Sequence, residues 1–521
     1  MAYISKNNGQ QLYARVKDAG GTTGGQLLRK DEMPATPEVT LNQPVMYIET
    51  AGGAAVTSKE TYVNCTYRIV NELGFGTELF NQPGRIRGRG NSTWTMPKKP
   101  YKVKLDNKVP VLGMPASRDF ALLANYIDPS KVRYAMANEI SGRTGLPWAP
   151  RSRNVEVYLN GSYQGLYQLS ESVEVDPNRV AIDELKASHT SGHNLTGGYI
   201  LEVDTRFEEN GEIGWRTRLG VPIIFDTPDG DIPQQYDYAK NFTQACEDAL
   251  FSEDFTAGAW RELLDAESWA DWYLLNELVC NNDSGFGASV KLTKPRDPVS
   301  GPPSKLHAGP GWDFDASCGI TFFIPHPPIG WWTRVGATWI ARMLEDPWFQ
   351  DVLKHRWALL HSRLLAEGDT IFDWLSNLEA DVAGAVARDE TVWGHGSAPN
   401  IYTWLSARIS WIDTQLIAGM GVDTTPPAVP TGFTTGAIDT TWIDFSWTDA
   451  GANQGTGVVG YRIRRNGIIA AITAYPYSTP LNTITVSGLT PGTNYSFTLE
   501  CRDATGNWSA ATAPLSVTTS V

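Results

Sequence analysis

The sequence is poor in the features that mark several classes of protein. Only 5 of its 521 residues are cysteines, and they are odd in number and widely spaced. They form no CxxC pair and no Cys/His pair at zinc-ligand spacing, which favours reduced and mostly buried thiols. The chain also has no run of about 18 apolar residues, so the sequence predicts no membrane span.

Positive charge is scarce as well. The chain has 43 Lys and Arg residues against 57 Asp and Glu residues, for a formal net charge of −14. This balance argues against a nucleic-acid partner. The opening MAYISKNNGQ has neither a basic n-region nor an apolar h-region, so we expect no secretory signal and synthesis in a bacterial cytoplasm.

Apolar residues are plentiful by contrast. Hydrophobic residues make up 41% of the chain and charged residues 19%, which excludes disorder over most of its length. A length of 521 residues corresponds to about three domains at roughly 150 residues each. The 19 Trp, 20 Tyr and 17 Phe residues indicate a thick core or a sugar- or protein-binding face.

Composition divides the chain into four parts. Residues 1–43 lack periodicity and contain GGTTGGQ (20–26) and MPATPEV (33–39), so we expect an extended N-terminal arm. Residues 44–422 change from short strands to helices near residue 234, and their strand half includes a hairpin signal, Asn160–Gly161. Residues 423–429 form a stiff, proline-containing linker, so few contacts should cross it.

The tail, residues 430–521, predicts a small β-sandwich. Its alternating runs are TWIDFSW (441–447), GYRIRRNG (460–467), TITVSGL (483–489) and NYSFTLECRD (494–503). Tyr495 follows a Pro-Gly turn, as a tyrosine corner requires. The tail closely resembles a fibronectin type III (FnIII) domain, which implies a spacer or adhesive module.

A glycine-rich segment, RIRGRGNSTW (85–94), precedes the lysine-rich PKKPYKVKLD (97–106). Glycines let a backbone approach an anion closely. The surrounding positive charge comes from Arg87, Arg89, Lys98 and Lys99. Alternation in YKVKL places Lys102 and Lys104 on one face of a strand. The combination indicates phosphate binding, with an ordinary turn as the alternative.

The segment YIDPSKVRYAMANEISGRTGLP (126–147) predicts a helix. Asp128 and Pro129 suit its N-terminus, and Gly145 suits its end. Glu139 falls at the edge of the apolar stripe. It either reaches solvent or pairs with a lysine on a neighbouring strand.

Carboxylates follow two apolar segments further along. SWADWYLLNELVCNND (268–283) predicts an apolar helix that ends at Asp283, and KLHAGPGWDFDASCG (305–319) places Asp313 and Asp315 after a short strand. Two carboxylates two residues apart, near a third, can hold a hard cation such as Mg²⁺. Surface aspartates are the alternative, but the aromatic flanks favour an enclosed site.

Several blocks in order carry a resemblance: RGRGNSTW, PKKPYKVKLD, LLANYIDPSKVR, APRSRNVEVYLNGSYQGLYQLSESV, GGYILEVD, NELVCNND and GPGWDFDASCG. Over about residues 44–365 the chain resembles the spore-coat protein H (CotH) kinase family. The resemblance implies an α+β fold, an atypical protein-kinase-like two-lobed domain, followed here by the all-β, immunoglobulin-like FnIII sandwich. It also implies transfer of the ATP γ-phosphate to protein Ser or Thr, with ATP and Mg²⁺ as cofactors.

The resemblance assigns nucleotide contacts. The loop over the phosphates would be Arg87, Gly88, Arg89, Gly90 and Asn91. Lys104, or with less support Lys102, would contact the α- and β-phosphates, and Glu139 would pair with that lysine. These roles rest on positioning and charge neutralisation rather than covalent chemistry.

It also assigns the reacting end of the site. Asp283 would orient or deprotonate the acceptor hydroxyl, and Asp313 would bind Mg²⁺ with help from Asp315. Kinase-like sites often place an asparagine metal ligand about five residues after the catalytic aspartate. Here SGFGASV (284–290) offers only Ser284 or Ser289. This departure leaves two alternatives, a weaker second metal site or a pseudokinase.

The alternative to a kinase is a structural or adhesive protein that keeps the fold without catalysis. The arm, the FnIII tail and the missing signal resemble bacteriophage virion proteins, especially tail or surface appendages. In that setting the arm would dock on other virion proteins, and host attachment would involve surface glycans or proteins. The chain would then form homo-oligomers in a virion. A glycan-acting enzyme is a weaker alternative, because no acid and nucleophile pair can be assigned.

Overall fold

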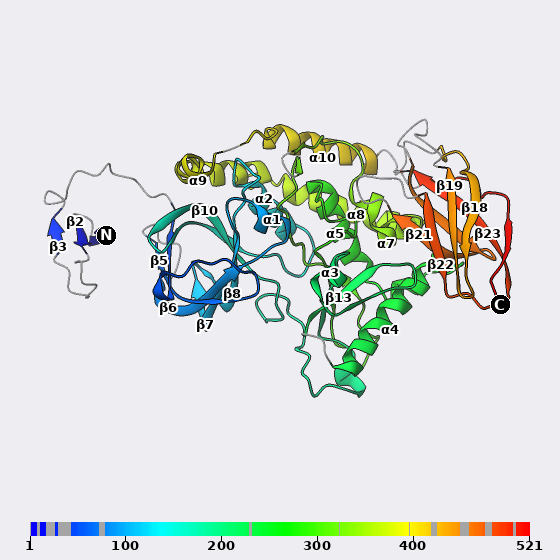
Figure 1. The fold of residues 1–521 in the computed structure, drawn as a ribbon. Coiled ribbons are helices and arrows are strands. Elements are labelled where there is room, and N and C mark those ends of the chain that lie inside the picture. Colours follow the sequence, from blue (N-terminus) through cyan, green and yellow to red (C-terminus); the bar gives the residue numbers. More distant parts are fainter. Residues whose placement is uncertain are drawn as a thin grey trace. The chain divides into compact units, whose positions relative to one another are not determined.

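The computed structural model describes residues 2–7, 11–16, 27–29, 43–71, 79–228, 232–321, 324–394, 396–417, 425–448, 458–474, 482–503 and 507–521. The chain divides into two compact units. The first comprises Met1–Ala124, Arg153–Leu169 and Ala380–Gly394. The second comprises Asn125–Ser152, Ser170–Glu379 and His395–Val521. Figure 1 shows the order of the elements along the chain.

Strands occur within the segment expected to be an extended arm. β1 (Ala2–Asn7), β2 (Gln11–Val16) and β3 (Leu27–Arg29) form an antiparallel three-stranded sheet. Local hairpin pairing needs only a few alternating residues, which is why the weak periodicity of this segment concealed it. The segments at 20–26 and 33–39 lie outside the described residues.

The rest of the first unit is dominated by a closed β-barrel with the strand order β10-β8-β7-β6-β5-β4-β9. The strands are β4 (Val45–Thr50), β5 (Val63–Val70), β6 (Leu79–Gly88), β7 (Tyr101–Val111), β8 (Met114–Leu123), β9 (Ser152–Leu159) and β10 (Ser162–Glu171). β4 and β9 pair in parallel. From β4 to β8, each strand pairs antiparallel with the next strand along the chain. The short helix α1 (Ser92–Thr95) connects β6 and β7.

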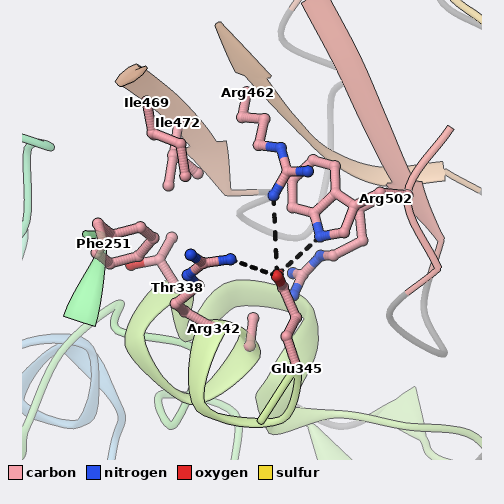
Figure 2. Close-up of a pocket in the computed structure, with 10 residues that line it drawn as sticks. Phe251, Thr338, Arg342, Glu345, Arg462, Ile469, Ile472 and Arg502 are labelled. Atoms are coloured by element: carbon pink, nitrogen blue, oxygen red, sulfur yellow. Dashed lines mark hydrogen bonds and ion pairs between the residues drawn. The ribbon is translucent and has the colours of Figure 1, made fainter. Parts of the chain in front are cut away.

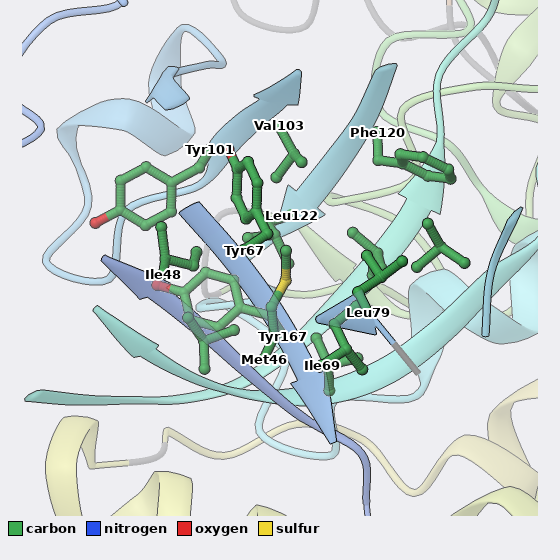
Figure 3. Packing of buried hydrophobic residues seen from close by; sticks show 14 of the residues in the cluster. Met46, Ile48, Tyr67, Ile69, Leu79, Tyr101, Val103, Phe120, Leu122 and Tyr167 are labelled. Atoms are coloured by element: carbon green, nitrogen blue, oxygen red, sulfur yellow. The ribbon is translucent and has the colours of Figure 1, made fainter. Parts of the chain in front are cut away.

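Period-two alternation builds the barrel core. In β7, Tyr101, Val103 and Leu105 are buried while Lys102 and Lys104 are partly exposed. The inward-facing residues of neighbouring strands pack against them (Figure 3). Each large apolar side chain buried this way stabilises the fold by about 1.5–3 kcal/mol. The predicted placement of both lysines on one face of a strand is therefore confirmed.

The hairpin between β9 and β10 turns at Asn160 and Gly161. Their φ angles are 49° and 76°, so both lie in the left-handed region. A two-residue type I′ turn requires positive φ at both positions, which asparagine and glycine tolerate best. The predicted hairpin is confirmed.

The second unit contains a five-stranded sheet of order β12-β13-β11-β14-β15, a small β16-β17 pair and most of the helices. The strands are β11 (Tyr199–Val203), β12 (Gly214–Arg216), β13 (Pro222–Thr227), β14 (Val290–Lys294), β15 (His307–Ala308), β16 (Ile320–Thr321) and β17 (Ile324–Pro325). The helices are α2 (Arg133–Arg143), α3 (Phe207–Asn210), α4 (Pro233–Leu250), α5 (Ala266–Val279), α6 (Thr333–Gly336), α7 (Thr338–Met343), α8 (Pro347–Leu364) and α10 (Ile401–Ile417). α9 spans Ile371–Trp393. No described helix is long and apolar enough to cross a membrane.

Two predicted helix boundaries are wrong. α2 begins at Arg133 rather than just after Asp128, because the Asp128 carboxylate instead accepts hydrogen bonds from Ser130 and from the Arg133 backbone, which holds a turn. α5 ends at Val279, where Cys280 adopts a left-handed φ of 49°. Asp283 therefore lies in the loop after the helix rather than at its end.

The tail is an FnIII sandwich. One sheet contains β18 (Thr431–Ile438), β19 (Trp442–Thr448) and β22 (Thr483–Ser487). The other contains β20 (Val458–Arg465), β21 (Ile468–Ala474), β23 (Asn494–Asp503) and β24 (Leu515–Thr518). Phe445, Trp447 and Tyr461 are among the buried core residues. The Tyr495 hydroxyl accepts the Thr490 backbone N–H at 3.0 Å, which confirms the tyrosine corner.

The expectation of few contacts across the linker is wrong. Trp508 Nε1 of the sandwich donates to Glu345 Oε1 at 2.8 Å (Figure 2), and Arg502 donates to the Arg334 carbonyl at 3.1 Å. Linker composition indicates stiffness but gives no information about complementary charges on the two sides. The whole chain is thus a mixed α/β protein with an N-terminal barrel and C-terminal FnIII sheets.

Candidate functional site

The glycine-rich loop lies between β6 and α1. An added Cβ at Gly88 would lie 2.5 Å from the Trp94 ring, and one at Gly90 would clash with the Thr93 hydroxyl. Gly90 also has a φ of 81°, in the region that favours glycine. Close packing therefore explains why glycine stands at both positions, without any ligand.

Parts of this loop already have partners within the first unit. The Gly88 N–H donates to the Ser58 carbonyl at 2.8 Å, and the Arg89 N–H donates to the Pro100 carbonyl at 3.2 Å. A phosphate would therefore be bound by other groups of the loop. Among these is the Arg87 guanidinium, which lies 5.1 Å from the centre of the Tyr62 ring. The Asn91 side-chain oxygen accepts a bond from Lys59 at 3.1 Å.

Lys98 is not part of the positive surround of the loop. It is fully buried, and its ammonium contacts both the Asp389 carboxylate and the Leu166 carbonyl at 2.5 Å. The Lys99 ammonium donates to the Trp94 carbonyl at 2.7 Å. The sequence placed both lysines near the loop, but the long-range partners of Lys98 and the local bond of Lys99 give them structural roles.

The strand lysines share a carboxylate. Asp119 on β8 lies 3.4 Å from Lys104 Nζ and 3.8 Å from Lys102 Nζ, and both lysine side chains are about one third exposed. Asp119 is directly opposite Lys104 in the antiparallel register. Glu139, the expected partner, instead accepts a bond from Arg143 at 2.9 Å. Sequence reasoning missed Asp119 because the register of the β7–β8 pair is not visible in the chain.

In the second unit, Asp283 and Asp313 come from two loops that are bonded together. The Asn282 N–H donates to the Ala316 carbonyl at 3.0 Å, which ties the loop after α5 to the loop after β15. The Asn282 amide group also donates to Asp283 Oδ1 at 3.4 Å. The backbone N–H of Asp313 donates to the Tyr134 hydroxyl at 3.2 Å. We call Asp283, Asp313 and their immediate partners the acidic centre.

The backbone around the acidic centre is unusual. Left-handed φ angles occur at Cys280, Phe286, Ser289, Asp313 and Cys318. Each non-glycine residue held this way costs about 1–3 kcal/mol, and such residues cluster at functional sites. The folded chain accepts this cost only because the surrounding contacts determine the conformation.

The two serines that replace the expected asparagine have different roles. Ser289 Oγ donates to Asp313 Oδ2 at 2.8 Å and is part of the acidic centre. Ser284 is buried and bonds the Asn281 carbonyl and the Thr333 hydroxyl instead. Of the two serines, the structure therefore brings only Ser289 to Asp313.

Charge is incompletely compensated in the acidic centre. Burial and the nearby charge of Asp313 raise the pKa of Asp283 to about 7, and the positive charge of Arg206 opposes that rise. Arg206 is itself bonded to the buried carboxylate of Asp204, through Nε at 3.2 Å and Nη2 at 3.1 Å. Thr205 donates twice to the Gly287 carbonyl, which holds this segment against the loop after Asp283.

Asp204 and Arg206 were not identified from the sequence as site residues. Asp204 ends GGYILEVD, a block that carries the family resemblance, but nothing in the local pattern distinguishes it from other aspartates at strand ends. Arg206 follows in a short turn before α3. Asp204 and Arg206 come near Asp283 only because the end of β11 folds against the loop after α5.

The acidic centre has the chemistry of a small oxygen-donor site. Among the described residues no group of three or more His, Cys, Asp or Glu is arranged to hold a metal ion. Mg²⁺ commonly uses one or two carboxylates plus water and substrate phosphates rather than a full protein cage. Asp283 and Asp313, with Ser289, fit that second pattern. Asp315 lies on the following turn and is partly buried.

Comparison with known proteins agrees with the two-part organisation. Residues 86–414, more than half of the chain, match the family model described as CotH kinase protein. Residues 428–518 match the fibronectin type III domain.

Curated relatives match over short stretches. Chitinase Chi52 of Paenibacillus xylanexedens is 45% identical over 98 residues, 19% of this chain and 17% of its own length. Exoglucanase A of Cellulomonas fimi is 42% identical over 117 residues, 22% of this chain and 12% of its own length. The chain thus spans less than a fifth of these relatives. A solved exopolygalacturonase of Yersinia enterocolitica matches 18% of this chain and 20% of its own, at 23% identity and a TM-score of 0.16, too low to support an argument.

Proposed function

This chain belongs to the CotH kinase protein family, and on that premise we propose that it transfers the γ-phosphate of ATP to Ser or Thr of a protein. A kinase-like two-lobed arrangement is part of this proposal. The observation that carries it is the acidic centre, where the half-buried Asp283 and Asp313 come together with too little positive charge to neutralise them. Such a pair suits a site completed by a cation and its phosphates.

Lys104, with Lys102 beside it, would attract phosphate oxygens, and the side chains of Arg87 and Arg89 would add donors. Asp313 would hold Mg²⁺, which supplies neutralisation of phosphate charge, with Ser289 and Asp315 at its side. Asp283 would orient the acceptor hydroxyl and accept its proton, and a pKa near 7 suits a general base at neutral pH.

Thermal unfolding with nucleotides tests the proposal. ATP with Mg²⁺ should raise the melting temperature of the full chain, and ATP without Mg²⁺ should raise it less, because ligand binding to the folded state stabilises that state. AMP with Mg²⁺ is the matched control, since it lacks the phosphates that the proposed site binds. Equal effects of ATP and AMP would reject a triphosphate site.

A non-catalytic protein is the second candidate, favoured by two observations. The loop amides of Gly88 and Arg89 are already bonded within the chain, and Ser284 points away from the acidic centre. In that case the chain would be a structural or adhesive virion protein that docks through residues 1–43. Mass spectrometry of purified particles should then find it at stoichiometric levels, and its absence from particles would reject this placement.

The relatives named as chitinases and exoglucanases suggest a role only for a short part of the chain. Their matched stretches are about as long as the FnIII domain. We infer that the FnIII domain is an accessory module that contacts surface glycans or proteins, not a glycan-cleaving part. A pull-down of residues 425–521 and of the full chain on insoluble chitin and cellulose would test glycan contact, and no retention on either polymer would leave only protein partners.

A further inference from the structure

The FnIII sandwich is joined to the helical part of the second unit by charged and aromatic groups. Glu345 accepts bonds from Arg342 at 2.6 Å and from Trp508 Nε1 at 2.8 Å, and Arg462 of the sandwich lies 3.9 Å away (Figure 2). The Arg462 guanidinium also lies over the Trp508 ring, 3.8 Å from its centre. These contacts fix the end of the sandwich that carries Arg502.

Arg502 reaches from the sandwich to a single helical turn. It lies on β23 and is 5% exposed. Its Nη2 donates to the carbonyls of Arg334 at 3.1 Å and Val335 at 3.4 Å, both within α6. The last carbonyls of any helix lack partners inside the helix, so α6 depends on donors from elsewhere.

The same turn supports the loop that carries Asp283. The Thr333 hydroxyl, at the start of α6, bonds the Ser284 hydroxyl at 2.8 Å, and both side chains are buried. At the other end of α6, an added Cβ at Gly336 would clash with the Gly285 carbonyl. The turn therefore packs directly against the two residues that follow Asp283.

α5 holds the turn from its other side. The Glu277 carboxylate accepts the backbone N–H of Trp332 at 2.9 Å and of Arg334 at 3.2 Å. α6 is thus bonded at its amides by α5 and at its carbonyls by the FnIII sandwich. The loop after Asp283 has left-handed residues at Phe286 and Ser289 and no strand partner of its own, so it depends on such external support.

We propose that Arg502 is a positioning residue for Asp283, and that the FnIII sandwich orders the loop 281–289 through α6. The contact path is Arg502, the carbonyls of α6, Thr333 and then Ser284. Its effect on catalysis rests on the proposed kinase function, but its effect on the order of the loop does not. The sandwich would therefore be a working part of the family domain, so that whatever binds or displaces it would change the activity of Asp283.

Hydrogen exchange on the full chain tests the loop directly. Arg502→Met should raise amide exchange in residues 281–289 and 333–336 by about tenfold or more, because two buried carbonyls lose their donor. Arg465→Met is the matched control: Arg465 also bonds a carbonyl, that of Gly488 at 3.2 Å, on an exposed part of the same sandwich. It should leave exchange in both segments unchanged. Unchanged exchange in folded Arg502→Met would overturn the proposal.

A second set of variants keeps the test valid if Arg502→Met fails to fold. Arg502→Lys retains one donor and should restore most of the protection. Thr333→Val cuts the path downstream and should by itself raise exchange in 281–289. Where Arg502→Met folds, adding it to Thr333→Val should have no further effect on that loop. Additive effects of the two changes would reject the path.

Kinetics separates this inference from the proposed function. If the chain transfers phosphate, Arg502→Met should lower kcat about tenfold with KM for ATP unchanged, and Arg502→Lys should recover it. An equal rise in KM for ATP would instead indicate general loosening and contradict a positioning role. If the wild type transfers no phosphate, the kinase proposal fails while the exchange result still decides the inference.

Discussion

The lysines of the barrel and the carboxylates of the acidic centre are held in different ways. Lys102 and Lys104 stand on one face of a paired strand, partly exposed, with Asp119 as a shared counter-charge. Asp283 and Asp313 stand on loops with left-handed backbone, and burial with mutual repulsion raises the pKa of Asp283 to about 7. The carboxylates of the second unit thus combine left-handed backbone with unbalanced charge, whereas the strand lysines of the first unit have neither. Such cost in a folded protein points to chemistry rather than to stability.

The largest effect should come from Asp283→Asn. If the acidic centre performs proton transfer, this change should reduce phosphate transfer from γ-labelled ATP by about 10²–10⁴-fold with little change in ATP affinity. The side chain keeps its size and loses only its basicity. Asp248→Asn, at an exposed aspartate that pairs with Arg218, is the control and should retain the wild-type rate. Wild-type transfer by Asp283→Asn would remove Asp283 from the chemistry.

On the barrel side, the largest effect should be on stability. Lys98→Met would leave the fully buried Asp389 without its counter-charge and should lower the free energy of unfolding by about 3–5 kcal/mol. Urea unfolding of the full chain would measure it. Lys354→Met, which removes an exposed i,i+3 ion pair, should change stability by less than about 0.5 kcal/mol. A loss for Lys98→Met no larger than that of the control would show that the pair is not buried.

The strand lysines allow a finer comparison. Lys104→Met should weaken ATP binding by about tenfold or more, as expected for one charge-assisted bond to a phosphate. Lys102→Met should weaken it less, although both lysines share the same face and the same aspartate. Calorimetric titration of both variants would show the difference. A larger loss for Lys102→Met would reverse the assignment, and no loss for either would remove the strand from the nucleotide site.

The smallest predicted effect concerns a half-buried imidazole in the second unit. Burial and the charge of Arg408 lower the pKa of His326 to about 4. Its stabilising contribution is therefore complete above pH 6.5 and is lost as pH falls toward 4, because the unfolded chain takes up the proton first. The free energy of unfolding should therefore fall less between neutral and acidic pH in His326→Gln than in the wild type. The difference should be about 1–2 kcal/mol, allowing for solvent screening. Urea unfolding at pH 7.5 and 4.5 would measure it, and the exposed His355→Gln variant should match the wild type.

Local patterns predicted the elements, and long-range pairing decided the site. The alternation of YKVKL, the Asn160–Gly161 turn and the tyrosine corner at Tyr495 depend on neighbouring residues, so the sequence alone predicted them correctly. The Lys104–Asp119 pair depends on strand register, and the Lys98–Asp389 pair joins residues far apart in the chain. Neither can be inferred from composition or spacing.

The same limit explains the tail. A proline-containing linker and a change of composition predicted a separate FnIII domain, and that fold is correct. The contacts of Trp508 and Arg502 with the helical part arise from single side chains on strands whose patterns indicate only the sandwich. A domain boundary in sequence therefore says little about whether two folds work independently.

Calorimetric titration of ATP with Mg²⁺ into the wild type and Asp313→Ala tests the central claim most directly. The acidic centre as a Mg²⁺–nucleotide site predicts measurable binding by the wild type, a loss of about tenfold or more in Asp313→Ala, and wild-type affinity in the exposed control Asp351→Ala. Without ligand, Asp351→Ala should keep the wild-type melting temperature, and Asp313→Ala should keep or exceed it, because it removes the charge that repels Asp283. Equal affinity of Asp313→Ala and the wild type for ATP with Mg²⁺ would contradict the account.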